Sequence, residues 1–202
     1  NIILGGGWNR YDGDHYGNVI WAQFLGDAVH NHKWYGNRGL KKDFNFYAKY
    51  NYQVTEKLSL FADAQHRRID YTIDGNDDDL RNITQDHHFN FFNPKLGIFY
   101  RPAASHEMYA SFSTANREPN RAAYTDIDPG KTPPVNETLY DTELGYKFKS
   151  TTFAGSANLY YMSYKDQLVL TGEINNVGNP IMVNVNNSYR AGIELQTGVK
   201  IL

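Results

Sequence analysis

Residues 95–105 read Lys95-Leu96-Gly97-Ile98-Phe99-Tyr100-Arg101-Pro102-Ala103-Ala104-Ser105. Leu96, Ile98 and Tyr100 alternate with residues of a second set that carries charge, namely Lys95, Gly97, Phe99 and Arg101. This period of two is typical of a strand with one apolar face and one polar face. Pro102 and the small residues after it then interrupt the alternation, as a tight turn does. The stretch therefore predicts a long strand that ends in a short hairpin turn.

The same arrangement recurs along the chain, and the two ends of the strands differ. Two further short turns are expected at Val54-Thr55-Glu56-Lys57 and Lys149-Ser150-Thr151-Thr152. Long loops rich in Asp, Asn, Gly and His run over residues 70–88, 116–137 and 171–180. A soluble sandwich has no reason to keep all its long loops at one end, whereas a transmembrane β-barrel has short periplasmic turns and long extracellular loops. The pattern favours an all-β, antiparallel transmembrane β-barrel.

Strand length supports this interpretation. Several alternating runs reach ten residues or more, which matches the roughly 9–11 residues that a barrel strand needs to cross a bilayer. Ordinary globular strands average about 5–6 residues. About eight strands are expected, over residues 1–8, 43–53, 58–71, 88–101, 106–115, 138–149, 153–170 and part of 181–202. Residues 9–42 are expected to be irregular, with 19–24 as either a short extra strand or a loop strand that projects beyond the membrane. The strands over 58–71, 106–115 and 153–170 should run outward.

Composition bounds the function. The chain has 202 residues, a formal net charge of -2, no Cys and a mean hydropathy of -0.63, with no apolar run of the roughly 18 residues of a transmembrane helix. The absence of a basic stripe argues against a nucleic-acid partner. No catalytic triad or Gly-rich phosphate loop is recognisable, so neither an enzyme nor a cofactor is predicted. Both ends fall inside strand patterns, and we expect residues 1–202 to be one partial domain of a longer protein.

Three clusters could suggest a metal ion. His30-Asn31-His32 and His87-His88 carry imidazoles, but neither has the spacing of a closed metal site. The acidic run over residues 74–79 resembles a calcium loop, yet Gly75 comes too early and the twelfth position is Gln85. We interpret these clusters as solvated loop residues and predict no metal site.

The strongest local signal is Arg117-Glu118-Pro119-Asn120-Arg121, which follows an aromatic strand. One interpretation is an ion pair that holds the start of a loop, and exposed pairs of this kind are common and weak. The other is an Arg pair that meets an anionic ligand or a plug domain in a barrel lumen. Composition alone favours the ion pair.

Longer segments resemble the TonB-dependent outer-membrane receptors. Residues 111–121 (Ser-Phe-Ser-Thr-Ala-Asn-Arg-Glu-Pro-Asn-Arg) are similar to the barrel motif that leads into a long outer loop. Residues 137–146 resemble the returning strand with its Glu-Leu-Gly, and residues 187–195 resemble the later Arg-x-Gly-x-Glu strand. Residues 15–21 look like a loop segment of one subgroup. The order and spacing of these motifs run through nearly the whole chain.

The resemblance implies that these strands belong to a larger barrel of about 22 strands with a plugged lumen. It implies TonB-dependent, energy-coupled uptake of a scarce nutrient, such as a ferric chelate, a cobalamin or a glycan, across the bacterial outer membrane. The implied partners are the nutrient, outer-membrane lipid and the TonB complex, reached through an N-terminal part with the plug that is not in this chain. Ligand contact is expected in the loops, and lumen or plug contact at the Arg117 motif. The loop candidates are Trp21, His30, His32, Trp34, Tyr35, Asp126 and Asp128, and the lumen candidates are Arg117, Glu118 and Arg121.

Three other interpretations remain open at this point. A small eight-strand outer-membrane barrel with a structural or adhesion role would carry no plug. An outer-membrane enzyme would need an acid–base or nucleophile set, which these residues do not supply. A soluble carbohydrate-binding β-sandwich would have shorter strands.

Overall fold

The computed structural model describes residues 1–24, 26, 29–127, 130–174, 178 and 180–201. Within these residues the chain forms eight strands and one short helix. The strands lie in one sheet in sequence order, so each is hydrogen-bonded to the next along the chain. Among the described residues, none belongs to a helix of the length and apolarity that crossing a membrane would require. The elements are β1 (Ile2–Val19), β2 (His32–Thr55), β3 (Leu58–Gly75), β4 (Gln85–Ala103), β5 (His106–Arg117), α1 (Arg121–Thr125), β6 (Glu137–Lys149), β7 (Phe153–Ile174) and β8 (Pro180–Val199).

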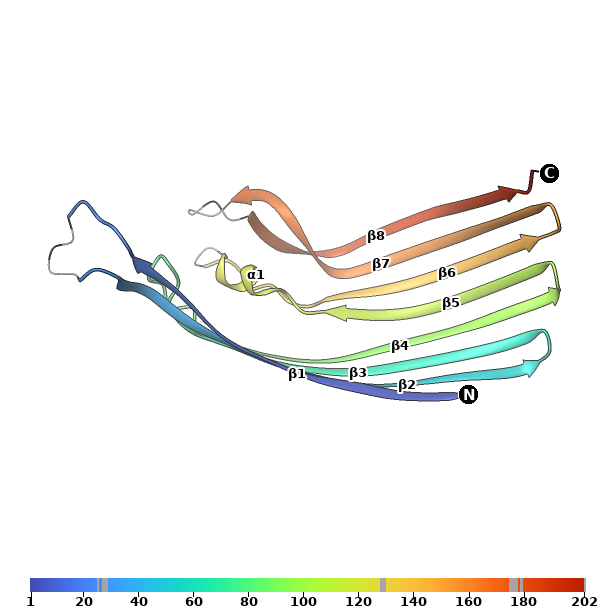
Figure 1. Cartoon of the computed structure of the whole chain (residues 1–202), viewed down its shortest axis with the longest axis horizontal. Coiled ribbons are helices and arrows are strands. Elements are labelled where there is room, and N and C mark those ends of the chain that lie inside the picture. Colours follow the sequence, from blue (N-terminus) through green and yellow to red (C-terminus); the bar gives the residue numbers. More distant parts are fainter. Residues whose placement is uncertain (25, 27–28, 128–129, 175–177, 179, 202) are drawn as a thin grey trace. The chain divides into compact units, whose positions relative to one another are not determined.

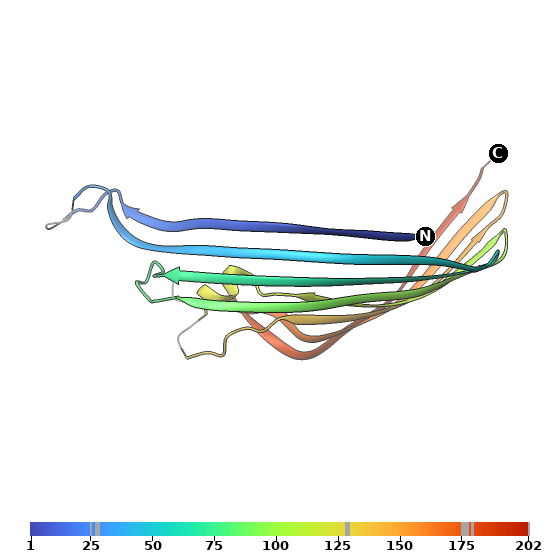
Figure 2. The same cartoon turned by 90° about the horizontal axis from the view of Figure 1, so that it is seen from below.

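The chain divides into two units, which are described separately. The first unit contains Asn1–Gly5, Phe46–His66 and Phe91–Leu202, and the second contains Gly6–Asn45 and Arg67–Asn90. In the first unit, the three expected short turns join β2 to β3, β4 to β5 and β6 to β7, and this prediction is confirmed. These turns lie at one end of the strands, while α1 lies at the opposite end of β5 and β6 (Figure 1). The same separation is visible in the second view (Figure 2).

The sheet of the first unit has two chemically different faces, fixed by its register. Ile98 pairs with Ala110, Ala110 with Leu144, Leu144 with Leu159, and Leu159 with Ile193. We call the side that bears this row the apolar face. The neighbouring row lies on the opposite side, because successive side chains of a strand alternate. That row contains Phe99, Tyr109, Gly145, Asn158 and Glu194, and we call its side the polar face.

Aromatic side chains on the apolar face gather at two levels. A short-turn band contains His106, Tyr146, Phe148 and Phe153, and the His106 Nδ1 lies 2.8 Å from the Tyr146 hydroxyl. A far band contains two stacked cross-strand pairs, Phe112 with Tyr140 and Tyr161 with Tyr189. Aliphatic side chains fill the space between the bands. Two aromatic girdles around an apolar belt are typical of a barrel wall that faces lipid.

Glycines on the polar face lie under aromatic rings. A Cβ atom added to Gly145 would meet the ring of Tyr109, and one added to Gly192 would meet the ring of Tyr160. The same relation joins Gly97 to Phe61 and Gly5 to Tyr47. Each contact links two strands that are connected by a long loop. The missing side chain of each glycine therefore allows a large ring to lie flat across the neighbouring strand.

The second unit shows where the sequence-based strand boundaries were wrong. Residues 9–19 and 32–42, expected to be irregular, continue β1 and β2, and residues 20–24 form no strand. β3 extends to Gly75 and β4 begins at Gln85, so this loop is shorter than expected. The alternation of apolar and polar residues is weaker in these strand ends, because other contacts stabilise them. The Arg38 guanidinium donates to both carboxylate oxygens of Asp12 at 2.7 Å, and the ring of Tyr35 covers Gly17.

The second unit also has a small core of its own. The side chains of Ile69 and Ile73 are fully buried, and Tyr71 and Ile83 are nearly so. The strand end at Gly75 approaches β2 closely, where its φ of 119° and a missing Cβ avoid a clash with the backbone of residues 36–37. The extended ends of the strands therefore pack against one another within the second unit.

Candidate functional site

A hydrogen-bonded cluster lies on the polar face across four strands. The Tyr109 hydroxyl of β5 lies 3.2 Å from Glu143 Oε2 of β6 and 2.9 Å from Asn158 Oδ1 of β7. The Asn158 amide in turn donates to Glu194 Oε2 of β8 at 3.4 Å. Tyr109 pairs with Gly145, and the absent side chain there lets the ring reach both partners. The cluster presents two carboxylates held by neutral donors, which suits a cationic partner on this face.

A second polar region lies on β2–β5 of the same face. A hollow of about 450 Å³ is lined by Lys49, Asp63, Gln65, Lys95 and neighbouring residues. The Lys49 ammonium lies 3.1 Å from the Asp63 carboxylate. Lys95 pairs with Ser113, which pairs with Asp141 of β6. Charges of both signs therefore line the polar face, in contrast to the apolar face behind them.

A chain of side-chain amides ties the far end of β3–β6 together. Asn93 donates to Gln65 Oε1 at 3.1 Å, and Asn93 Oδ1 accepts from both the backbone and the side chain of Asn116 at 3.0 and 2.9 Å. Thr138 completes the chain by donating to Asn116 Oδ1 at 2.7 Å. Pro94 has no backbone N–H to donate, so side chains replace the regular ladder at this point. The chain fixes where β5 leaves the sheet and enters its loop.

Arg117, at the end of β5, pairs with Glu137 at the start of β6. Its Nη2 donates to Glu137 Oε2 at 3.0 Å, and the same oxygen accepts the backbone N–H of Leu168 at 3.1 Å. The side chain of Glu137 is 12% exposed, whereas that of Arg117 is 63% exposed. The pair holds the two ends of the β5–β6 loop and leaves most of the Arg117 side chain exposed.

That loop is also fastened to β8, through Val135. The side-chain amide of Asn184 accepts from the N–H of Val135 at 2.9 Å and donates to its carbonyl at 3.0 Å, as a paired strand would. It also donates to the carbonyl of Asp166 at 2.7 Å. A cavity of about 400 Å³ lies beside this joint, with Lys131 and Glu173 among its lining residues. This volume is within the range of small-ligand pockets, roughly 300–1,000 Å³.

The β5–β6 loop contains the remaining lumen candidates. Glu118 follows β5, and Arg121 is the first residue of α1, which was not expected from the sequence. Asn120 begins this helix by accepting the N–H of Ala123 at 2.9 Å through its side chain. Asp126 ends the helix as its C-cap residue. Asp128 lies outside the described residues.

Five ligand candidates lie in the second unit, on or beside the connection between β1 and β2. Trp21 is 78% exposed, and His30 and His32 are also exposed. Trp34 has a structural bond, since its indole N–H donates to the carbonyl of Asp78 at 2.9 Å. Tyr35 covers Gly17. The structure thus brings these five to one end of one hairpin, while Asp126 belongs to the first unit.

Ion pairs set the charge state of the second unit. Hydrogen bonds from Arg38, and then from Arg10, lower the pKa of Asp12 from 3.8 to about 2. The acidic loop is closed by its own cation, because Asp77 accepts from Arg81 Nε at 2.8 Å and thereby raises the pKa of Arg81. Across the described part of the chain, no three His, Asp or Glu side chains gather in a way that could hold a metal ion.

Sequence reasoning missed the residues that organise this site. Glu137, Asn184 and Asn93 act through side-chain contacts between distant segments, which no local pattern signals. Glu143 and Glu194 were within reach, because both stand in the quoted motifs, Glu-Leu-Gly and Arg-x-Gly-x-Glu. A glycine lies two residues from each of them on the polar face, and that spacing was the available signal.

Comparison with known proteins gives a consistent result. The family model described as "TonB dependent receptor-like, beta-barrel" matches residues 1–200. No curated protein matches the sequence. Among solved structures, the FrpB iron transporter of Neisseria meningitidis (F3-3 variant) is similar with a TM-score of 0.60 and 20% identity, over 81% of this chain and 24% of FrpB.

Two further solved structures cover the whole chain. The copper transporter OprC has a TM-score of 0.75 at 12% identity, over 100% of this chain and 33% of OprC. The ferric-catecholate import receptor Fiu of E. coli K12 has a TM-score of 0.66 at 14% identity, with the same coverage of 100% and 33%. At these identities the likeness concerns the fold, and the chain spans 33% or less of each of these three transporters. By its match over residues 1–200, the chain belongs to the TonB-dependent receptor family and forms part of the β-barrel.

Proposed function

We propose that this chain is part of an outer-membrane receptor for TonB-dependent, energy-coupled nutrient uptake. Residues 1–202 form a section of a barrel of about 22 strands, with the plug and the TonB-contacting segment in other parts of the protein. The short turns face the periplasm and the long loops face outside. The observation that carries this proposal is the contrast between the two faces of the sheet. An apolar face bounded by aromatic bands suits lipid, and a face with charges of both signs suits a lumen filled by a folded plug.

The nutrient is a scarce compound of the class that includes ferric chelates, cobalamins and glycans. The similar solved structures include an iron transporter, a ferric-catecholate import receptor and a copper transporter, which favours a metal or its chelate. Ligand contact is assigned to Trp21, His30, His32, Tyr35 and the exposed edge of Trp34. Asp126 and Asp128 are assigned to the same role in the β5–β6 loop. The cavity beside Asn184 offers a further place for part of a small ligand.

Plug contact is assigned to Arg117, Glu118 and Arg121, with the carboxylates of Glu143 and Glu194 as counterparts for plug cations. Arg117 suits this role because its side chain is 63% exposed although Glu137 already accepts a hydrogen bond from one of its nitrogens. A guanidinium has five N–H donors in a planar fork, so several stay available for an anionic partner.

The test is energy-dependent uptake by cells that carry the full-length receptor. Radiolabelled copper, a ferric catecholate and cyanocobalamin are supplied with and without an uncoupler of the proton-motive force. Uncoupler-sensitive uptake of one of them is expected, and its absence for all three would contradict a transport role in this ligand class. Arg117→Ala should lower uptake while the barrel still assembles. The matched control is Arg68→Ala, since Arg68 is 59% exposed and paired with Asp70 at 3.1 Å. Equal uptake by both variants would remove Arg117 from the mechanism.

A further inference from the structure

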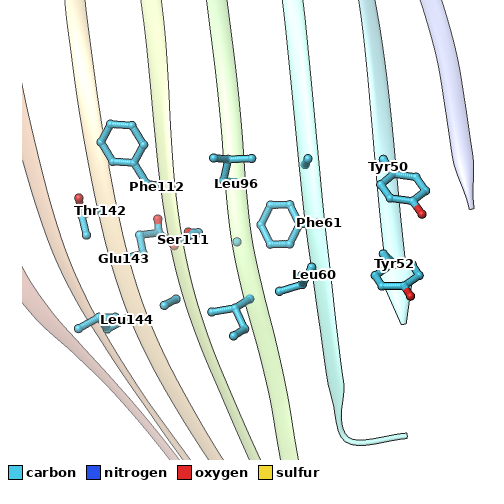
Figure 3. A pocket seen from close by; sticks show the side chains of 14 residues that line it. Tyr50, Tyr52, Leu60, Phe61, Leu96, Ser111, Phe112, Thr142, Glu143 and Leu144 are labelled. Carbon is cyan, nitrogen blue, oxygen red and sulfur yellow. The ribbon is translucent and has the colours of Figure 1, made fainter. Parts of the chain in front are cut away.

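The apolar face of the first unit is interrupted by a hollow of about 630 Å³. Its walls are the side chains of Tyr50, Tyr52, Leu60, Leu96, Phe112 and Leu144, contributed by β2–β6 (Figure 3). Ten of the 14 lining residues belong to the apolar face. The other four, Phe61, Gly97, Ser111 and Glu143, alternate with them along the strands.

The hollow forms where small side chains are surrounded by larger side chains of the neighbouring strands. Ala110 lies between its cross-strand partners Ile98 and Leu144. In the next row, Phe112 lies between Leu96 and Thr142. Ala62 adds a second small position in the floor. On the β2 side, the stacked rings of Tyr50 and Tyr52, with centroids 6.0 Å apart, form a flat wall.

The surroundings of the hollow identify its occupant. It extends from Phe112 of the far band into the aliphatic belt, where the outer side of a barrel faces hydrocarbon. An unfilled hollow would cost the lining atoms their dispersion contacts, and a flexible acyl chain can supply them. On β2 and β3 the hollow reaches toward the short turns, because Leu60 and Tyr52 lie beside the turn between these strands, whereas on β5 it lies at mid-strand, at Ala110 and Phe112. His106 and Tyr146 of the short-turn band offer polar atoms on the same face.

We propose that this hollow binds one acyl chain of a phospholipid from the periplasmic leaflet. The proposal rests on the proposed function in one respect, the orientation of the short turns toward the periplasm. The acyl chain lies across Ala62 and Ala110 and contacts Leu96, Phe112 and Leu144. The glycerol and ester groups lie at the short-turn band, where His106 and the Tyr146 hydroxyl offer polar atoms.

The experiment compares the lipid that stays with the full-length receptor after extraction of outer membranes in mild detergent. Native mass spectrometry identifies and counts bound lipids for wild type, Ala110→Leu and Ala157→Leu. Leu at position 110 fills the floor of the hollow, and Leu is well tolerated on a lipid-exposed surface. Ala157 is the matched control, because it lies on the same face between Tyr146 and Leu195 but does not line the hollow.

Wild type and Ala157→Leu are expected to retain one phospholipid. Ala110→Leu should retain about tenfold less, since the added side chain displaces roughly two methylene groups of the bound chain. Equal phospholipid retention by all three proteins would overturn the proposal. If wild type retains lipopolysaccharide instead, the phospholipid assignment is wrong. The assignment is also wrong if wild type retains a second copy of the receptor and Ala110→Leu does not. Failure of the proposed function would be seen separately, as wild-type receptor that is absent from the outer membrane or inactive in uptake.

Discussion

Replacing Gly145 with Ala should destabilise the barrel through a single ring contact. Gly145 is buried on the polar face, and the new Cβ would coincide with the ring of its cross-strand partner Tyr109. The ring must move, and its hydroxyl then loses Glu143 and Asn158, which lie 3.2 and 2.9 Å away. The substitution therefore disturbs packing and hydrogen bonding together.

The expected magnitude combines three contributions. Overpacking of a well-packed site costs about 1–3 kcal/mol. Losing the tyrosine's hydrogen bonds costs about 1 kcal/mol more. Ala is favoured over Gly in a strand by roughly 0.5–1 kcal/mol, which offsets part of this loss. Gly145→Ala should therefore lower the free energy of unfolding by about 1–3 kcal/mol.

Gly198→Ala provides the matched control. Gly198 also lies in a strand of the first unit, paired with Ala154, but a Cβ there would meet nothing within 4 Å. This variant should be neutral or more stable by up to about 1 kcal/mol. The measurement is guanidinium unfolding of the full-length receptor in micelles, followed by tryptophan fluorescence. If Gly145→Ala unfolds at the same denaturant midpoint as Gly198→Ala, the ring contact is not a determinant of stability and the reasoning fails.

Three other predictions concern orientation, loop attachment and charge. A Cys placed at Asn76 should be labelled by an impermeant maleimide on intact cells, whereas a Cys at Ala104 should not, and reversed labelling would refute the proposed topology. Asn184→Ala removes the two hydrogen bonds that fasten Val135 of the β5–β6 loop to β8, and a third to the carbonyl of Asp166 in β7; exchange of the Val135 amide hydrogen should rise about tenfold, and unchanged exchange would show that other contacts hold the loop. Arg38→Gln should raise the pKa of Asp12 from about 2 toward 3.8 in a carboxyl NMR titration. Because the folded pKa is lowered, the stabilising effect of this pair is complete above pH 3.8 and is lost as the pH falls toward 2; an unshifted midpoint in the variant would contradict the pairing.

Alternation predicted the strands of the first unit because their successive residues lie on the apolar face and the polar face in turn. The run from Lys95 to Arg101 has this property, and its strand and the following turn are confirmed. The same rule failed for residues 9–19 and 32–42, where the strands extend past the alternating segments. There, Asp12 and Arg38 pair across strands, and only a known register could have revealed that contact. A strand can therefore be predicted from the sequence where one of its faces is apolar and the other is polar. It cannot be predicted in this way where cross-strand ion pairs stabilise the sheet.

The site was predictable to a smaller extent, for a reason that lies in how its residues act. The sequence singled out Arg117 but offered Glu118 as the adjacent anion, whereas the structure pairs Arg117 with Glu137, twenty positions away. Closure of the β5–β6 loop brings Arg117 and Glu137 together. No periodicity of the sequence encodes the number of residues in such a loop.

The two faces also separate the effects of mutation. A substitution at Ala110 of β5 affects only the apolar face. A substitution at Gly145 of β6, the neighbouring strand, affects only the polar face. Lipid retention and uptake should therefore respond to different residues of β5 and β6, even where those residues are neighbours. A variant that changed both together would have moved the strand itself, and its unfolding midpoint would reveal that. Measuring stability beside each functional assay thus distinguishes a role of the side chain from a role of the backbone beneath it.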